Sequence, residues 1–554
     1  MYLQGLKGPK NILLIHNFHW HWYWTHPSLS TGLKTSKSLT MVSHRCGRIT
    51  TFLPTLLLMA ASKESWTYDV VYGEIPKEIN RTFYRMTIDP AVPPHPKNPF
   101  LEGDGNLTVF QFQDGRVHMK VKYVETERYL VERKAGKRLF GTYRNPFTTH
   151  PCVRMADDST GNTNIVYWGG KLLALSERSL PYEMDPDTLE TRGFDPFRGQ
   201  VKAKTFTAHP KVDPFNNELV TYGYEAKGLG TPDICYYAID SSGKVKDETW
   251  FKEDQNGMPH DAWLTENWLI LSSMPFKVNS DEDMKAGAHH WEFVPDRPSA
   301  FWLAPRKAST PRAADWKVGE VRKYTWNNGV IIHCGAAWEE EDGTLRLESH
   351  FVSFNVFFDF NPPGMRPPQT PSGDWVRWTV DPKQPSGTRL AAPEILMPYI
   401  CDFPKTDERF STRKQKIVFL ISCDAGKEAK PGMLHFNSIV KLNTETKEMM
   451  VFAPAPDARV AEPVFVNRSK DAPEGDGWII CWTDRPSRPR VELVILDTND
   501  FSKPVAVVQL PFASRMQVHG NWVDNPNPGQ PLPRLTRPVK DIQPSVHGSL
   551  NRIE

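Results

Sequence analysis

The stretch that decides the fold runs from Leu107 to Val124 and reads LTVFQFQDGRVHMKVKYV. Phe110 and Phe112 alternate with polar residues, Asp114-Gly115 follows, and apolar residues then resume the same alternation. A period of two residues is typical of a strand with one buried face, and Asp-Gly favours a tight two-residue turn. The stretch therefore predicts a β-hairpin.

Similar units recur along the chain, whereas long patterns at helical spacing are scarce. The turns fall at Gly169-Gly170, Ser242-Gly243, Asp342-Gly343 and Asn443 to Lys447. Many hairpins without alternating helices predict repeated antiparallel sheets. A propeller protects the sheet edges by radial repetition and leaves a central axis where side chains of several blades meet. We expect an all-β propeller with divergent blades, because no WD or kelch repeat occurs.

Composition excludes several classes of function. The formal net charge of +2 gives no strong field for nucleic acid or an anionic membrane. The seven cysteines contain no CxxC and read as free thiols of a reducing compartment. The apolar run from Phe52 to Ala61 is shorter than the ~20 residues that span a bilayer. A cytoplasmic protein without a transmembrane segment is the expectation.

The sequence pattern divides the chain into three parts. Residues 1–65 form an atypical leader, 66–530 a single propeller domain, and 531–554 a C-terminal tail. The leader contains NFHWHWYWTH, from Asn17 to His26, which could bind copper or zinc adventitiously. No companion ligands support a functional metal site there.

Nucleotide, serine-hydrolase and zincin motifs are absent. Among 17 histidines, four lie in informative settings: His209 in TAHPKVDP directly after a strand, His260 in GMPHDAW before a strand, His333 inside the strand GVIIHCGAAW, and His519 in MQVHGNW, where Gly520 permits a close backbone approach. Each belongs to a different strand–turn unit, as ligands on a propeller axis would. Taken singly, each is more often a core or loop histidine.

Ordered motifs identify a family. They are GEIPKEINRTFYR, LEGDGN, RLFGTYRNPFT, NTNIVYWGGKLLALSE, LPYEMDPDTLETRG, TAHPKVDP, the histidine segments, AEPVFV, PEGDGW and HGNW. The set resembles the carotenoid cleavage oxygenases, and within them the lignostilbene and isoeugenol dioxygenases that cleave aryl alkenes. The resemblance implies a seven-bladed propeller with a loop and helix cap over one Fe(2+) per chain, with O2 as co-substrate.

The resemblance also implies residue roles. His209, His260, His333 and His519 match the iron ligands, and Glu177, Asp402 and Glu462 match the acids that orient them. Asp402 stands where many relatives have glutamate. Neutral imidazoles suit ferrous iron.

At the substrate end, the family uses a tyrosine and a lysine to hold a phenolic hydroxyl. The tyrosine matches Tyr143, but Ser176 replaces the lysine, and a serine carries no charge to stabilise a phenolate. Arg178 could substitute, although strand alternation points it to the other face. Three phenylalanines are expected either to line the pocket or to belong to the core: Phe354, Phe357 and Phe358.

The prediction is an enzyme that cleaves a carbon–carbon double bond of a phenylpropenoid or stilbene and yields two carbonyl products. Ser176 raises an apocarotenoid or a non-phenolic alkene as the alternative substrate. A propeller that binds a ligand without catalysis is a second alternative. A zinc hydrolase is a weaker one, because catalytic zinc usually has three protein ligands and a water.

Overall fold

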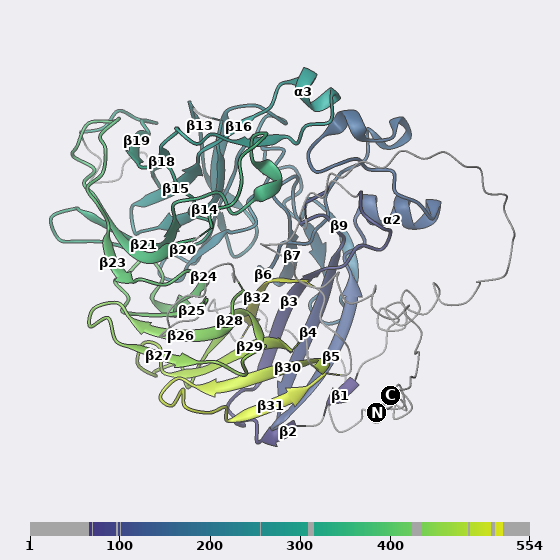
Figure 1. The fold of residues 1–554 in the computed structure, drawn as a ribbon, viewed down its shortest axis with the longest axis vertical. Coiled ribbons are helices and arrows are strands. Elements are labelled where there is room, and N and C mark those ends of the chain that lie inside the picture. The colour runs from purple at the N-terminus through teal and green to yellow at the C-terminus, as the bar shows by residue number, and fades with distance from the viewer. Residues whose placement is uncertain are drawn as a thin grey trace, which may run out of the picture.

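The computed structural model describes residues 66–523, apart from residues 69, 96–97, 100, 255, 308–314, 370, 424–434, 486–487 and 511–515. The described strands form seven sheets of four or five strands and one two-stranded sheet. The sheets succeed one another around a common centre (Figure 1), which confirms the all-β, seven-bladed propeller. The predicted leader, its His/Trp-rich and apolar segments, and the predicted tail lie outside the described residues, so the division of the chain stays a prediction.

The first blade contains β1 (Trp66–Tyr68), β3 (Arg81–Ile88), β4 (Gly105–Gln113), β5 (Arg116–Tyr123) and β32 (Met516–Val523). The second contains β6 (Asn164–Trp168), β7 (Lys171–Leu175), β8 (Tyr182–Met184) and β9 (Thr191–Phe194), and the third contains β10 (Lys211–Asp213), β11 (Glu218–Gly223), β12 (Asp233–Asp240) and β13 (Val245–Lys252). The fourth contains β14 (Met258–Leu264), β15 (Trp268–Met274), β18 (Ser299–Pro305) and β19 (Arg322–Trp326). The last three blades contain β20 (Cys334–Glu339), β21 (Leu345–Val352), β22 (Gly373–Val380) and β23 (Glu394–Met397); β24 (Cys401–Lys405), β25 (Ile417–Ser422), β26 (Ser438–Asn443) and β27 (Met449–Phe452); β28 (Arg459–Asn467), β29 (Gly477–Arg485), β30 (Arg488–Asp497), β31 (Ala506–Gln509) and β2 (Val70–Gly73). The small sheet pairs β16 (Phe276–Val278) with β17 (Trp291–Phe293).

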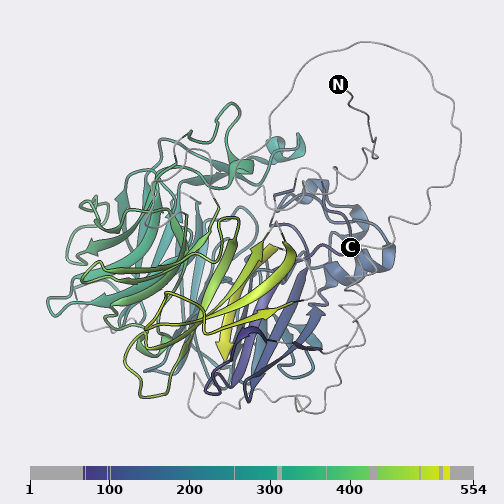
Figure 2. The same ribbon diagram turned by 60° about the horizontal axis from the view of Figure 1, so that its bottom comes forward.

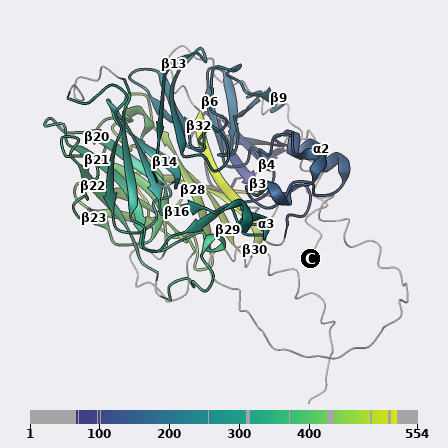
Figure 3. The same ribbon diagram turned by 90° about the horizontal axis from the view of Figure 1, so that it is seen from above.

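The ring closes by exchange between the two ends of the described chain. β32 pairs antiparallel with β3 in the first blade, and β2 pairs with β31 in the seventh. Figure 3 shows the yellow β32 beside the purple β3. Gly520 is required here, because a Cβ atom would lie 2.7 Å from the ring of Phe83 and 2.8 Å from the carbonyl oxygen of Tyr84. The expected close approach at Gly520 is confirmed.

The hairpin predicted between Leu107 and Val124 is confirmed. β4 and β5 pair with Gln113 opposite Arg116. Asp114 and Gly115 turn between them with φ angles of 52° and 74°, and two positive φ values match the right-handed twist of the flanking strands. The Gly169-Gly170 turn repeats this geometry between β6 and β7.

Short helices form a cap at one side of the propeller (Figures 1 and 2). The α-helices are α2 (Glu127–Ala135) and α3 (Asp281–Lys285), and the 3-10 turns are Pro146–Thr148, Pro151–Val153, Phe358–Phe360 and Glu408–Phe410. In α2 the Thr126 side chain accepts a hydrogen bond from the amide of Tyr129, and Gly136 ends the helix at a φ of 64°. No helix in the described part of the chain is long and apolar enough to cross a bilayer.

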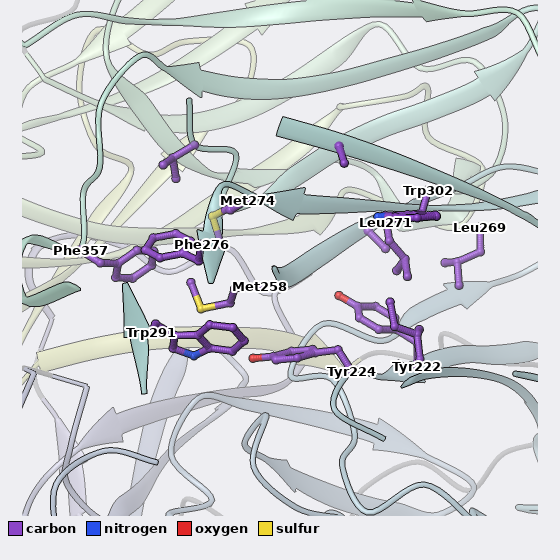
Figure 4. Close-up of a cluster of buried hydrophobic side chains, with 14 of the residues drawn as sticks. Tyr222, Tyr224, Met258, Leu269, Leu271, Met274, Phe276, Trp291, Trp302 and Phe357 are labelled. Carbon is purple, nitrogen blue, oxygen red and sulfur yellow. The ribbon is translucent and has the colours of Figure 1, made fainter. Parts of the chain in front are cut away.

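A buried aromatic cluster joins this cap to the third and fourth blades. Figure 4 shows Trp291 beside Tyr224, with Met258, Phe276 and Phe357 close by. The rings of Tyr224 and Trp291 are 6.3 Å apart, and those of Phe276 and Phe357 are 6.1 Å apart. Each such side chain contributes roughly 1.5–3 kcal/mol by leaving water. The cluster therefore fixes the cap against the blades beside the site.

Candidate metal and substrate site

The four selected histidines come from four different blades. His260 lies in β14 and His519 in β32, while His209 and His333 precede β10 and β20. His333 was expected inside a strand and His260 before one, and both placements were wrong by a few residues. Pairing shifts register between Pro259 and Ala262, and between Cys334 and Ala337. Bulges of this kind redirect side chains. One lies in β14 at His260, and the other lies in β20 directly after His333.

The four rings converge. Nε2 of His209 lies 3.0 Å from Nε2 of His260, and one ring nitrogen each from His209, His260 and His333 fall within 4.8 Å of one another. The ring of His519 is centred 4.6 Å from that of His209 and 4.8 Å from that of His333. A cavity of about 170 Å³ is lined by three of these rings, those of His209, His333 and His519.

Three histidines face a carboxylate with their other ring nitrogen. Nδ1 of His260 lies 2.7 Å from Glu177 Oε1, Nδ1 of His333 lies 2.8 Å from Asp402 Oδ1, and Nδ1 of His519 lies 2.9 Å from Glu462 Oε1. Such partners hold the proton on Nδ1 and turn the Nε2 lone pair inward. Nε2 of His333 is buried and has no hydrogen-bond partner among the described residues.

Burial and neighbouring charges keep the rings of His209 and His519 neutral and the Glu462 carboxylate ionised. Burial and the neighbouring histidines hold the pKa of His209 well below 6.5, and burial lowers the pKa of His519 to about 4. For His260 burial opposes charge, but Glu177 outweighs it and raises the pKa. Burial likewise opposes ionisation of Glu462, yet Lys405 and His519 bring its pKa to about 2. The neutral imidazoles of His209 and His519, with His260 and His333 beside them, fit a ferrous or similar divalent metal ion.

Sequence reasoning missed the groups behind the acids. Glu462 accepts a hydrogen bond from the amide of Gly520 at 2.7 Å and lies 3.5 Å from Lys405 Nζ and 3.6 Å from Arg85 Nη1. His350 Nε2 accepts hydrogen bonds from the amides of Ile332 and His333, at 2.6 and 3.2 Å, and so fixes the backbone at a candidate ligand. Arg85 is fully buried. The one signal in the sequence was an arginine within the largely apolar segment FYRMTI, residues 83–88.

Tyr143 lies in the aromatic cluster next to the cap. Its ring stacks on Phe360 at 5.9 Å, and burial raises the pKa of its hydroxyl, which therefore stays protonated. The Arg178 guanidinium is 4.6 Å from the centre of this ring and that of Arg144 is 5.8 Å away. β7 ends at Leu175, so strand alternation does not set the direction of Arg178. Its guanidinium nevertheless meets Glu102 and Asp158, whereas Glu177 faces His260.

Both arginines are committed to acids. Arg144 pairs with Glu225 and donates from Nη2 to the carbonyl oxygen of Glu177 at 2.8 Å. Arg178 Nη2 lies 2.8 Å from Glu102, and Nη1 lies 3.3 Å from Asp158. Their positive charges are therefore largely neutralised beside Tyr143.

Ser176 directly precedes Glu177 at the start of this turn. Its side chain is buried, and Oγ has no hydrogen-bond partner among the described residues. An unpaired buried hydroxyl has a free donor and free acceptor capacity, which a ligand oxygen or a water can satisfy.

The three phenylalanines belong to the aromatic cluster. Phe354 and Phe357 are buried in it, and Phe358 is half-buried against it. Phe354 also lines a separate small cavity of about 40 Å³ with His350. Packing explains all three, and a role in contacting substrate stays a prediction.

Comparison with known proteins decides the family. Residues 59–524 match the family model described as retinal pigment epithelial membrane protein. The chain belongs to the carotenoid cleavage oxygenase family. It is 47% identical over 485 residues to resveratrol cleavage oxygenase 1 of Botryotinia fuckeliana, covering 87% of each chain, and 37% identical over 469 residues to isoeugenol monooxygenase of Pseudomonas putida, covering 82% of this chain and 93% of the other.

Among solved structures, lignostilbene dioxygenase of Pseudomonas brassicacearum superposes with a TM-score of 0.77 and 34% identity, covering 84% of this chain and 96% of that one. The family consists of non-haem iron oxygenases that use O2. The resemblance drawn from the ordered motifs is thereby confirmed for both family and fold.

Proposed function

We propose that this chain is a dioxygenase that cleaves the alkene double bond of a stilbene or phenylpropenoid and yields two carbonyl compounds. One alkene and one O2 give two carbonyl products, so all atoms balance. The observation that carries the proposal is the convergence of four histidines from four blades, three of them backed by carboxylates. The names of the relatives, which include resveratrol and isoeugenol oxygenases, support the reaction class.

His209, His260, His333 and His519 would hold one ferrous ion per chain. Iron at this position supplies the redox chemistry that allows O2 to react with an alkene. The chain's own contribution is to keep Nε2 lone pairs free, because Glu177, Asp402 and Glu462 each occupy an Nδ1 position.

Tyr143 and Ser176 would orient the aryl end of the substrate. Tyr143 keeps its proton, so it can donate a hydrogen bond to a substrate oxygen. Ser176 adds a neutral hydroxyl whose hydrogen-bonding capacity is unused. Phe354, Phe357 and Phe358 would provide apolar contact with the substrate.

An alternative substrate, a non-phenolic alkene or an apocarotenoid, is favoured by one observation. The two arginines beside Tyr143 are paired with acids, so among the described residues neither of them is left free to stabilise a phenolate there. A methoxylated ring or a polyene forms no phenolate, so its binding would not depend on such a cation.

The test is product analysis with iron-loaded protein. Isoeugenol, a hydroxystilbene, its methoxylated counterpart and an apocarotenal are supplied with O2, and carbonyl products are identified by mass spectrometry. Aldehydes from the aryl alkenes support the proposal, and products from the methoxylated stilbene or the apocarotenal alone select the alternative. Iron binding without any product contradicts catalysis and favours a ligand-binding propeller.

The location of the protein in the cell stays a proposal. Six cysteines among the described residues are free thiols, and five of these are buried. Unpaired thiols of this kind favour the reducing cytoplasm.

A further inference from the structure

A further cavity lies between the cap and the second and third blades. Its volume is about 530 Å³, which falls in the range of small-molecule sites. It is lined by residues of the cap between Phe140 and Asp158, by Arg178, and by two segments of the third blade near Thr205 and Glu225. None of the four histidines, Tyr143 or Ser176 is among its lining residues.

The walls of this cavity are suited to an aromatic ring. Phe140, Phe147, Val153 and Leu229 all line it. Phe147 and Leu229 remain 37% and 44% exposed, so apolar surface at the opening is left uncovered. Apolar side chains exposed together around a hollow are a common feature of ligand sites.

The charge of the lining is positive. Four cations line the cavity against two acids, Asp158 and Glu225. Arg144 pairs with Glu225 and Arg178 with Asp158, as described above. The remaining cations, Arg154 and Lys204, are exposed and form no ion pair with any acid of the described residues. Two uncompensated charges therefore stand beside an apolar hollow.

We propose that this cavity is a binding site for a small aromatic anion such as a carboxylate. Its ring would lie against Phe147 and Leu229, and its charge would be met by Arg154 and Lys204. Charge-assisted hydrogen bonds from these two side chains would give the site its preference for an anion over a neutral ring. Because Arg144 and Arg178 form part of the wall and also contact Tyr143, the ligand lies one layer of side chains from the substrate site.

The experiment uses the full chain without iron, so that a carboxylate cannot bind a metal. Binding of 4-fluorobenzoate is followed by fluorine NMR, with 4-fluorobenzamide as the neutral probe of the same shape. We expect saturable binding of the benzoate and much weaker binding of the benzamide. The double variant Arg154→Gln/Lys204→Gln is expected to bind the benzoate at least about tenfold more weakly, while Lys470→Gln, an exposed lysine of the seventh blade, leaves it unchanged.

Three outcomes overturn the proposal. Equal binding of the two probes, or unchanged binding in the double variant, shows that the cationic opening does not recognise an anion. If the double variant instead loses binding to vesicles of anionic phospholipid while the native protein ignores 4-fluorobenzoate, the opening contacts a membrane. Both altered side chains are exposed, so an unchanged melting temperature controls for folding. The assay needs no turnover, and its result is independent of alkene cleavage.

Discussion

The histidine centre and the Tyr143 end of the site differ in what their charged side chains contact. In the centre, each carboxylate faces a histidine that is itself a candidate ligand, so the negative charges orient the residues around the metal position. At the Tyr143 end, Arg144 and Arg178 are matched by acids of the surrounding structure, and the groups left for substrate are uncharged hydroxyls. The difference indicates that the centre is built for a cation and the far end for a neutral oxygen.

Removing a ligand is the largest expected disruption of the centre. In His333→Ala the buried Nε2 atom is lost, and we expect iron binding and turnover to fall by more than the ~100-fold that a lost supporting partner can cost. Iron content by mass spectrometry and product formation check this. His150→Ala, which changes an exposed histidine of the cap, is the matched control. Retained iron at native content would show that the three other histidines suffice.

Removing one supporting charge has a smaller effect on the same centre. Glu462→Gln keeps the size of the side chain but weakens its hold on His519 and removes the partner of Lys405 and Arg85. We expect iron affinity to fall by about 10–100-fold, measured by competition with a chelator. Glu341→Gln, on an exposed turn, should leave the affinity unchanged. An equal loss in both variants would mean that net charge, and not the contact with His519, matters.

Adding a charge tests the Tyr143 end. Ser176→Lys introduces a cation at the buried position before Glu177, and a hydrogen bond to a charged group is worth about 1.5–3 kcal/mol. We expect kcat/KM for a hydroxystilbene to rise about tenfold or more relative to its methoxylated counterpart. Ser176→Met, similar in length but uncharged, is the control. A gain of the same size with methionine would show that filling the space, and not charge, governs the preference.

A buried acid outside the histidine centre gives a prediction about stability. Burial raises the pKa of Glu253 from 4.5 to about 8, although Ser273 donates a hydrogen bond to it. The folded protein therefore binds an extra proton between these values. The stability that this group contributes is complete below pH 4.5 and declines as pH rises toward 8, by up to about 1.4 kcal/mol per pH unit.

Glu253→Gln should remove this decline, because glutamine does not titrate. Urea midpoints of the metal-free protein at pH 5 and pH 8 measure it, with Glu341→Gln as the control. A variant that loses as much stability between the two pH values as the native protein would show that Glu253 is ionised in the fold.

The sequence predicts the centre better than its surroundings. His209, His260, His333 and His519 could be selected because each falls in a different strand–turn unit and because the ordered motifs of the family align them with its metal ligands. The hairpin at Asp114-Gly115 has its own local signal. The contacts behind them depend on residues far apart in sequence. Glu462 and Arg85 are 377 residues apart, and Arg144 and Glu225 are 81 apart. No local pattern identifies such pairs, because only the closed ring of blades brings them together.

Arg178 illustrates the second limit. Strand alternation cannot set its direction, because the strand ends at Leu175 and the period of two no longer applies. The φ of 52° at Arg144 is a similar case, since a left-handed conformation at a non-glycine residue is imposed by the surrounding fold.

The most direct test of the central claim is cleavage of a stilbene by the iron-loaded protein under ¹⁸O₂. Both carbonyl products are reduced to alcohols at once, which stops exchange of the carbonyl oxygen with water. Their ¹⁸O content is then measured by mass spectrometry. A dioxygenase that uses the four-histidine centre should place one ¹⁸O atom in each product. Label in only one product, with the other oxygen taken from water, would contradict the account and indicate a monooxygenase.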